Sequence, residues 1–425
     1  MRVGFLLFHP LSESLGSARR VIDIAIELKK EGIEPVIITP FSKRTTIRGI
    51  DIVEMPGFSG FGRGEQFYQI ARNVAGNSLL GKFVIRNMVR RKISNAQLAF
   101  LKELNLDVLQ MEQELTAVMA LPLVKTLGIP LVLEFHGIWI DELIDSGLIS
   151  AKGKECRILR ESISEAIKQI DAILVLSEEM KNYITEKYEA TNEQVYTVGM
   201  GIRPKIECLP ERNNSVKVVY AGMLSKEKNV DLLLKSIPYI LAKNKEISFY
   251  LTKKGDMVNA ASKAFEQCGG KVEFFWFNDE NQLFDFLSQC NIGILTLPDN
   301  LSYQINPASK FFDYLSVGLP IVMNNIGGWT KAIEEDDVGL LSTNDPEDFA
   351  AAILRLAENQ ELALKFGKKC LELSKSKYNL DTTVAKLLKL YSSLHDEDRL
   401  KMLPQKGLPI KVLLINNQNV KKGTV

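Results

Sequence analysis

Lys310 and Asp313 lie three residues apart in the stretch 306–320. The spacing of apolar residues in this stretch predicts a short helix between two buried strands. The helix should follow the apolar run 292–297 and end before a second apolar run at 321–323. Lys310 and Asp313 would then occupy its first turns, at the mouth of a parallel sheet. A cation at a helix start suits phosphate, and a carboxylate there suits sugar hydroxyls. Alternatively, both side chains are solvated on an exposed helix.

Other polar or glycine-containing segments also follow predicted strands. In a doubly wound parallel sheet, the carboxyl ends of the strands border one crevice, where ligands bind. Glycines at these ends let a phosphate approach backbone N–H groups, and lysines near helix starts can reach a diphosphate. The candidate residues identified in this way are His9, Gly16, Glu112, Glu114, His136, Gly222, Lys228, Gly327 and Gly328.

Each candidate also has a purely structural alternative. Gly16 alone fits a tight turn, and the GxGxxG spacing of a dinucleotide site is absent. Lysines such as Lys228 are common in strand-to-helix loops, and a lone histidine is often a core residue, although the strand–His–Gly context of His136 favours a functional role. The acids at 334–337 are adjacent and are followed by Gly339, so we predict a solvated turn there rather than a metal site.

Size and composition indicate a multidomain globular protein. The chain has 425 residues, 46% of them hydrophobic and 25% charged, which suggests two or three domains with substantial cores. A net charge of +1 gives no reason to expect nucleic acid as a partner. Five scattered cysteines without a CxxC pair fit a reducing compartment with neither disulfides nor a zinc site. No apolar run approaches the ~18 residues of a membrane span, so we expect a cytoplasmic protein.

Three further segments allow more than one interpretation. Glycines and phenylalanines at 56–64 predict either a lid over a substrate or a long connection. Basic and apolar residues are interleaved in 82–92, which predicts either weak peripheral contact with a membrane surface or a helix packed on the core. The segment 411–417 could be an edge strand, the opening of another such domain, or part of a disordered tail.

Apolar runs of strand length alternate with helical patterns along most of the chain. This order predicts an α/β protein whose strands form parallel, doubly wound sheets. Residues 196–201, with two glycines, suit a linker between the halves. The predicted strands lie at 3–8, 35–38, 50–55, 106–111, 129–135 and 172–176 in the first half and at 216–220, 247–251, 272–277, 292–297 and 321–323 in the second.

The order of these motifs resembles the retaining glycosyltransferases of family GT4, which have the GT-B fold, over roughly residues 1–394. Residues 220–224 with Lys228 resemble the family's Gly-Arg-Leu…Glu-Lys-Gly turn. Residues 307–314 with 318–320 resemble its Pro…Lys-Leu-Phe-Glu-Tyr…Gly-x-Pro segment, and Gly327-Gly328 matches the glycines that follow. In the first half, the family's order is also seen in Gly16, His136, Ser177-Glu178 and Val198-Gly199.

The resemblance implies two Rossmann-like, doubly wound parallel-sheet domains that face a cleft. It divides the chain into an acceptor domain, a nucleotide-sugar domain, a helix that crosses back to the first domain and a tail, at 1–200, 201–380, 381–396 and 397–425. A sugar would pass with retention from a UDP-, GDP- or ADP-linked donor to a glycan, a lipid-linked molecule or a small molecule. Neither a metal nor another cofactor would be needed.

The resemblance also implies roles for the candidate residues. Lys228 would bind the departing diphosphate with help from Lys310, and Asp313 would replace the glutamate that holds the ribose. We expect exposed cleft positions for Lys228 and Asp313. His136 would lie near the transferred sugar, with either its backbone or its imidazole, and act with Lys228 in catalysis. The remaining candidates complete the two subsites, with Gly16, Gly222, Gly327 and Gly328 on the donor side and His9, Glu112 and Glu114 on the acceptor side.

Three departures from the family pattern leave alternatives. Met223 stands where the family has arginine, Ile305 stands where it has the first glutamate of a pair, and Asp313 shortens the second. A different arginine or lysine could replace the missing cation. Otherwise, the chain could be a sugar- or nucleotide-binding partner without catalysis. An epimerase of nucleotide sugars would need several acid/base groups in the cleft, and the chain has few.

Overall fold

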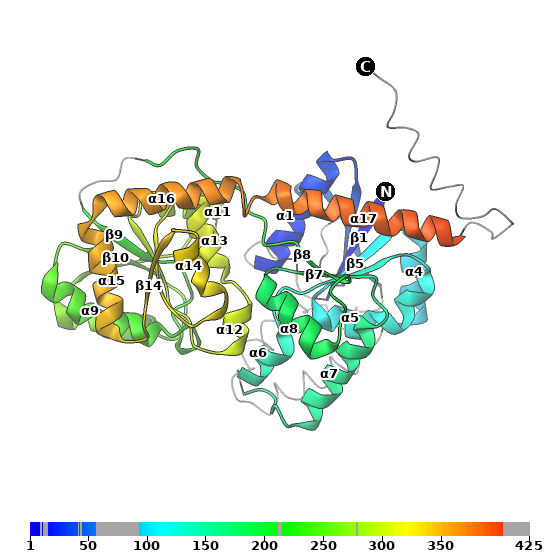
Figure 1. The fold of residues 1–425 in the computed structure, drawn as a ribbon, viewed down its shortest axis with the longest axis horizontal. Coiled ribbons are helices and arrows are strands. Elements are labelled where there is room, and N and C mark those ends of the chain that lie inside the picture. Colours follow the sequence, from blue (N-terminus) through cyan, green and yellow to red (C-terminus); the bar gives the residue numbers. More distant parts are fainter. Residues whose placement is uncertain are drawn as a thin grey trace, which may run out of the picture.

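A computed structural model describes residues 1–8, 11, 16–40, 42, 45–56, 93–145, 147–210, 215–277 and 279–402. Within these ranges the chain forms two α/β domains, each built on one mainly parallel sheet with helices on both faces (Figure 1). The predicted fold class is therefore confirmed. His9, most of the loop at 56–64, the basic segment 82–92 and the end of the tail from residue 403 lie outside the described residues.

The first sheet has its strands in the order β3-β4-β2-β1-β5-β6-β7-β8. All neighbours are parallel except β3 and β4, which pair antiparallel. The central strands are buried on both faces, which explains their continuous apolar sequences. The strands are β1 (Arg2–Leu7), β2 (Glu34–Thr39), β3 (Thr46–Ile47), β4 (Ile50–Glu54), β5 (Val108–Glu112), β6 (Leu131–Glu134), β7 (Ala172–Val175) and β8 (Val195–Thr197).

Helices cover this sheet on two sides. One face packs against α1 and the last helix of the chain, and the other packs against α4, α5, α6, α7 and α8. Val3 and Phe5 of β1 point to the first of these cores, whereas Leu6 points to the second, as strand alternation requires. The helices are α1 (Gly16–Lys30), α4 (Asn95–Glu103), α5 (Gln113–Val124), η2 (Lys125–Leu127), α6 (Trp139–Asp145), α7 (Lys154–Ile167) and α8 (Glu178–Tyr188).

The second sheet is parallel throughout, with the order β11-β10-β9-β12-β13-β14. Its two faces form two separate cores. The strands are β9 (Lys217–Tyr220), β10 (Ser248–Thr252), β11 (Lys271–Phe275), β12 (Ile292–Leu295), β13 (Ile321–Asn324) and β14 (Gly339–Ser342). The helices are η3 (Lys226–Lys228), α9 (Val230–Lys243), α10 (Val258–Cys268), α11 (Glu280–Ser288), α12 (Leu301–Ile305), α13 (Ser309–Ser316), η4 (Gly328–Lys331), α14 (Ala332–Glu335), α15 (Pro346–Glu358) and α16 (Gln360–Lys375).

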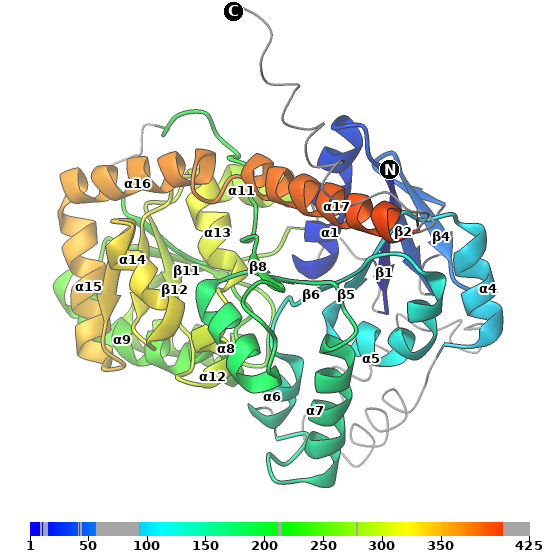
Figure 2. The ribbon, with the colours of Figure 1, turned by 45° about the vertical axis from the view of Figure 1, so that its right-hand side comes forward.

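A long C-terminal helix, α17 (Leu380–Met402), crosses from the second domain to the first. It lies along α1 in both ribbon views (Figures 1 and 2). At its start the backbone N–H of Leu380 donates to the carbonyl of Ile202, and further along Leu387 and Tyr391 enter the core of the first domain. The helix begins one residue before the predicted segment 381–396 and continues six residues beyond it.

Three short strands, β3, β8 and β14, were not among the sequence-based predictions. Strand β8 was predicted to be part of a linker, because three residues are too few for a clear alternation. Strand β14, which was not predicted, begins at Gly339, directly after the acids at 334–337; a Cβ atom at this glycine would lie 1.9 Å from the carbonyl oxygen of Ile321. Glycine is needed there because the two backbones approach closely.

None of the helices that the structure describes combines the length and the apolar character that a bilayer crossing requires.

Candidate functional site

Helix α12 of the second domain is docked onto the first domain. The Ser302 hydroxyl donates a hydrogen bond to Asp145 over 2.5 Å, and the Ser177 hydroxyl donates to the carbonyl of Ile305 over 2.8 Å. Ile305 is buried in the core of the first domain. An acidic side chain at this position would therefore need a different packing, so the departure at Ile305 has a structural role in joining the domains.

Lys228 faces the docked helix. Its ammonium donates to the hydroxyl of Tyr303 and lies 4.5 Å from the centroid of that ring. The Thr296 hydroxyl donates to the carbonyl of Lys228 over 2.8 Å, which fixes the loop between β9 and α9. Lys228 is half-buried rather than fully exposed, and its charge is held where the two domains meet.

Asp313 is buried between two cations. Its Oδ2 atom lies 2.8 Å from Nζ of Lys310, and its Oδ1 atom lies 3.0 Å from a guanidinium nitrogen of Arg19 on α1. Burial alone would raise the pKa of Asp313, but the charges of Lys310 and Arg19 outweigh it, so the pKa lies below its ordinary value. The expected exposed position for Asp313 is wrong, because its side chain is only 3% exposed. Cations from both domains enclose it.

Arg19 is a site residue that the sequence alone did not identify. It belongs to the first domain, and its second guanidinium nitrogen lies 3.1 Å from Glu280 at the start of α11. The only sequence signal was its place three residues after Gly16, the glycine that begins α1. Met223, which replaces the arginine of the family pattern, is exposed. Arg19 therefore adds a cation to the junction, from the opposite domain.

The glycines of the second domain are used mainly for close packing. A Cβ atom at Gly328 would lie 2.0 Å from the carbonyl oxygen of Gln304 on α12, whereas one at Gly327 would meet open space. The N–H of Gly327 already donates to the Asn325 side chain over 2.9 Å. A Cβ at Gly222 would lie 2.9 Å from the ring of Tyr220. The predicted phosphate contacts of these three glycines stay predictions.

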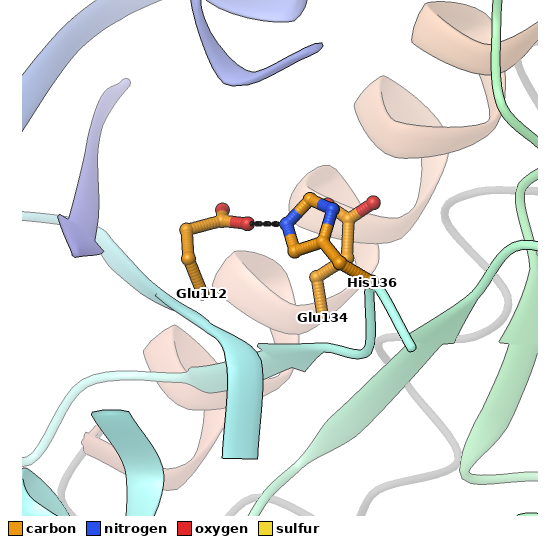
Figure 3. A group of neighbouring side chains, drawn as sticks. All are labelled: Glu112, Glu134 and His136. Atoms are coloured by element: carbon orange, nitrogen blue, oxygen red, sulfur yellow. Dashed lines mark hydrogen bonds and ion pairs between the residues drawn. The ribbon is translucent and has the colours of Figure 1, made fainter. Parts of the chain in front are cut away.

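His136 follows β6 and is paired with a carboxylate. Its Nε2 atom lies 2.5 Å from Oε2 of Glu112, which stands at the end of the neighbouring strand β5 (Figure 3). Glu134 lies beside this pair and forms a 2.7 Å ion pair with Arg20 of α1. Gln110 donates from one amide nitrogen to both glutamates, over 2.8 Å each. The histidine is thus part of a buried hydrogen-bond network.

The three residues of Figure 3 could also be considered as metal ligands, because one atom of each lies within 4.8 Å of the others. Their hydrogen bonds favour a different interpretation. Each oxygen of Glu112 and Glu134 already accepts from Gln110, His136 or Arg20. Arg20 supplies a fixed positive charge beside Glu134, so an added cation would have to displace it.

Glu112 and Glu114 are almost completely buried, with exposures of 0% and 1%. Glu114 accepts a 2.9 Å hydrogen bond from the backbone N–H of Trp139, and burial raises its pKa to about 8. Neither carboxylate offers surface to an acceptor in this conformation. Their predicted acceptor contacts remain untested, and Glu112 now has a defined partner in His136.

The turn after His136 meets the second domain. A Cβ atom at Gly137 would lie 3.1 Å from the side-chain nitrogen of Asn306, between α12 and α13. The segment 303–313 therefore gathers four of the candidates, because it carries Lys310 and Asp313 and contacts Lys228 at Tyr303 and Gly328 at Gln304. Arg19 joins it at Asp313, and Gly137 lies beside it at Asn306. Two cations, Lys228 and Arg19, thus contact this interdomain segment, and the turn that follows His136 lies beside it.

Two family models match the chain. The model "Glycosyltransferase Family 4" matches residues 15–205, and "Glycosyl transferases group 1" matches residues 215–359. The first match covers the domain with His136 and Arg19, and the second covers the domain with Lys228 and Asp313.

Curated relatives are distant. The chain is 23% identical over 256 residues to a probable glycosyltransferase, WbjE, of Pseudomonas aeruginosa, covering 56% of this chain and 63% of that protein. It is 24% identical over 244 residues to the poly(ribitol-phosphate) alpha-N-acetylglucosaminyltransferase of Staphylococcus aureus (strain COL), covering 54% and 46%. The chain thus spans less than two thirds of the length of each relative.

The fold is also found in solved structures. The chain resembles Anabaena Alr3699/HepE in complex with UDP and glucose, with a TM-score of 0.64, 14% identity, and coverage of 92% of this chain and 100% of that one. Together with the two parallel-sheet domains, this similarity shows the GT-B fold.

Proposed function

We propose that this chain, whose two domains have the GT-B fold and match glycosyltransferase models, moves a sugar from a nucleotide-sugar donor to an acceptor with retention. The observation that carries the proposal is that Lys228 and Arg19 contact the segment 303–313, which itself carries Lys310 and Asp313, and that the turn after His136 lies beside it. Charged groups that follow the strands of the second sheet lie there beside a turn of the first domain, as a reaction between two bound substrates requires.

In this proposal, the lysines hold the leaving group. The bond from the anomeric carbon to the diphosphate breaks, the acceptor oxygen forms a new bond to that carbon on the same face, and the acceptor proton leaves with the diphosphate. Negative charge therefore grows on the diphosphate. Lys228 and Lys310 are already fixed by Tyr303 and Asp313, so little reorganisation is needed when this charge develops.

Asp313 is the proposed partner of the ribose. Since each of its oxygens already accepts one charged donor, a ribose hydroxyl has to share Asp313 with Arg19 or displace that side chain. Arg19 is the better candidate for displacement because it comes from the other domain and also contacts Glu280. Donor binding would then be coupled to the contact between the domains.

The donor and acceptor classes rest on the relatives. The HepE complex contains UDP and glucose, and the S. aureus relative is named for transfer to poly(ribitol-phosphate). A UDP-linked hexose or N-acetylhexosamine is therefore the first donor to test, with GDP- and ADP-sugars as alternatives. The proposed acceptor is a hydroxyl-rich glycan or a lipid-linked form of one.

A second candidate function is donor binding without transfer. It is favoured by the exposed Met223, which provides no charge where the family pattern has arginine, and by Ile305, which is packed in the first domain's core. Arg19 argues against it because it provides another cation nearby.

Both functions can be tested on the purified chain. Thermal shifts with UDP-, GDP- and ADP-sugars identify the donor, since a ligand that binds the folded state raises the Tm. Release of the nucleoside diphosphate with and without glycan acceptors then measures turnover, and NMR of the product gives the anomeric configuration. Binding without release would favour the second function, and an inverted product would exclude retention.

A further inference from the structure

We propose that Glu112 is a positioning residue for His136, and that Gln110, held by Tyr391 of α17, fixes Glu112 in turn. This chain of contacts makes the C-terminal helix part of the first domain's site. The inference relies on the proposed function only for its kinetic readout.

The strand register brings the participating residues together. Gln110 and Glu112 are two residues apart on β5, so they point to the same face of the sheet. Glu134 of β6 lies directly opposite Glu112 in the parallel register. All three side chains are 0% exposed, and so is Tyr391. Water is excluded, so the orientation of each group depends on the others.

Gln110 can be oriented in only one way. Its amide nitrogen donates to Oε1 of Glu112 and to Oε2 of Glu134, and its amide oxygen accepts from the hydroxyl of Tyr391. A flipped amide would place its oxygen against two carboxylates and its nitrogen at the tyrosine. The Tyr391 contact therefore reinforces the direction that the two glutamates impose.

The distribution of charge assigns a partner to each carboxylate. Arg20 pairs with Glu134, which leaves His136 as the partner of Glu112. Burial and the neighbouring Glu134 raise the pKa of Glu112 above its ordinary value, and the contact with His136 opposes that rise. In the proposal Nε2 of His136 carries the proton between the two groups, so that Glu112 accepts from both Gln110 and His136. Among the described residues, Nδ1 has no hydrogen-bond partner, so it is the ring atom that a ligand can use.

The position of α17 connects this network to both domains. At its start, the backbone N–H of Leu380 donates to the carbonyl of Ile202, and Asp381 forms an ion pair with Arg203. Further along the helix, the hydroxyl of Tyr391 donates to Gln110. His136 in turn precedes Gly137, which touches Asn306 of the second domain. The network thus fixes His136 directly before the turn that lies beside the interdomain segment 303–313.

The direct test is the tautomer of His136. The chain contains only three histidines, so ring ¹⁵N signals can be assigned by comparison with His136→Asn. In the intact protein we expect one tautomer, with hydrogen on Nε2. Glu112→Gln and Gln110→Met should each populate both tautomers. This readout needs no donor or acceptor, so it is independent of whether the proposed transfer reaction occurs.

Kinetics provide the second readout. We expect Glu112→Gln and Gln110→Met to lower kcat by roughly 10- to 100-fold, as is typical for loss of a group that orients a functional side chain, and to leave the donor KM nearly unchanged. Gln194→Met is the matched control. Its amide donates to the carbonyls of Ile167 and Ile170, before β8 begins, so it should lose stability without changing kcat or the tautomer.

A single Nε2–H tautomer that persists in Glu112→Gln would overturn the inference. So would an equal loss of kcat in Gln194→Met, because the effect would then follow general stability. If the wild-type chain transfers no sugar from any donor, the proposed function fails, whereas the tautomer experiment still decides the positioning role of Glu112.

Discussion

The guanidinium of Arg19 lies 3.0 Å from the carboxylate of Asp313, although the two residues belong to different domains and are 294 positions apart in the chain. Lys310 contacts the other oxygen of the same carboxylate. The residue proposed to hold the donor's ribose is thus also a point at which the two domains are joined.

Replacing Arg19 should weaken this contact without exposing an uncompensated charge. In Arg19→Ala, Asp313 keeps Lys310, so we expect a loss of about 1–3 kcal/mol in the free energy of unfolding, whereas Asp313→Ala removes the carboxylate shared by Lys310 and Arg19, leaves Arg19 with Glu280 alone, and should cost more. Urea unfolding of both variants measures the difference. Equal stability of Asp313→Ala and the wild type would contradict the ion pairs described here.

Acid should weaken the same contact. The pKa of Asp313 is lower in the folded state, so its contribution to stability is fully present above the ordinary aspartate pKa and is lost as pH falls through the folded value. Asp313→Asn lacks this contribution at every pH. We therefore expect the difference in Tm between wild type and Asp313→Asn to shrink below about pH 4, where an unfolded aspartate takes up its proton. A constant difference between pH 2.5 and 7 would disprove the assignment.

Glu114 should have the opposite pH dependence. Its pKa rises from 4.5 to about 8 on folding, so the folded state keeps a proton that the unfolded state loses. Stability therefore falls as pH rises from about 4.5 to 8. Glu114→Gln cannot lose a proton, so its Tm relative to the wild type should increase across this range. Parallel Tm curves for the two proteins would show that Glu114 has an ordinary pKa.

The lysine beside Tyr303 should matter for turnover and little for folding. Lys228→Ala removes a half-buried charge that we propose stabilises the leaving diphosphate, so kcat should fall on the order of 10²-fold, with a Tm close to that of the wild type. Lys226→Ala, two residues earlier and exposed, is the matched control. Similar turnover in the two variants would remove Lys228 from the proposed site.

The paired glycines should differ in their tolerance of alanine. Both have positive φ, so either substitution should cost on the order of 1–3 kcal/mol in backbone strain. Gly328→Ala must also move α12, because its Cβ would lie 2.0 Å from the carbonyl oxygen of Gln304, whereas Gly327→Ala meets open space. We expect the larger loss of stability, and a larger increase in donor KM, for Gly328→Ala. Equal losses would mean that α12 does not rest on Gly328.

Local sequence patterns were enough to predict the two α/β domains. Strands β5, β6, β9 and β12 are buried on both faces. Because such strands have mainly apolar residues at consecutive positions, they can be recognised in the sequence. The helix that carries Lys310 and Asp313 was predicted for the same reason, since its apolar residues and its terminating glycine and proline are all local signals. His136 could be placed at a strand end because the strand before it is clear.

Only the tertiary structure could decide which groups these residues contact. Periodicity shows that a side chain is buried, but it does not identify the partner across the core. The pairing of Tyr391 with Gln110 spans 281 positions, and that of Ser177 with Ile305 spans 128. Strands β3 and β8 were missed because two or three residues are too short for a periodic signal, and β14 because it has only two large apolar residues between a glycine and a serine. Arg19 is a site residue because folding places α1 next to Asp313. No local pattern in the sequence predicts that these two residues are in contact.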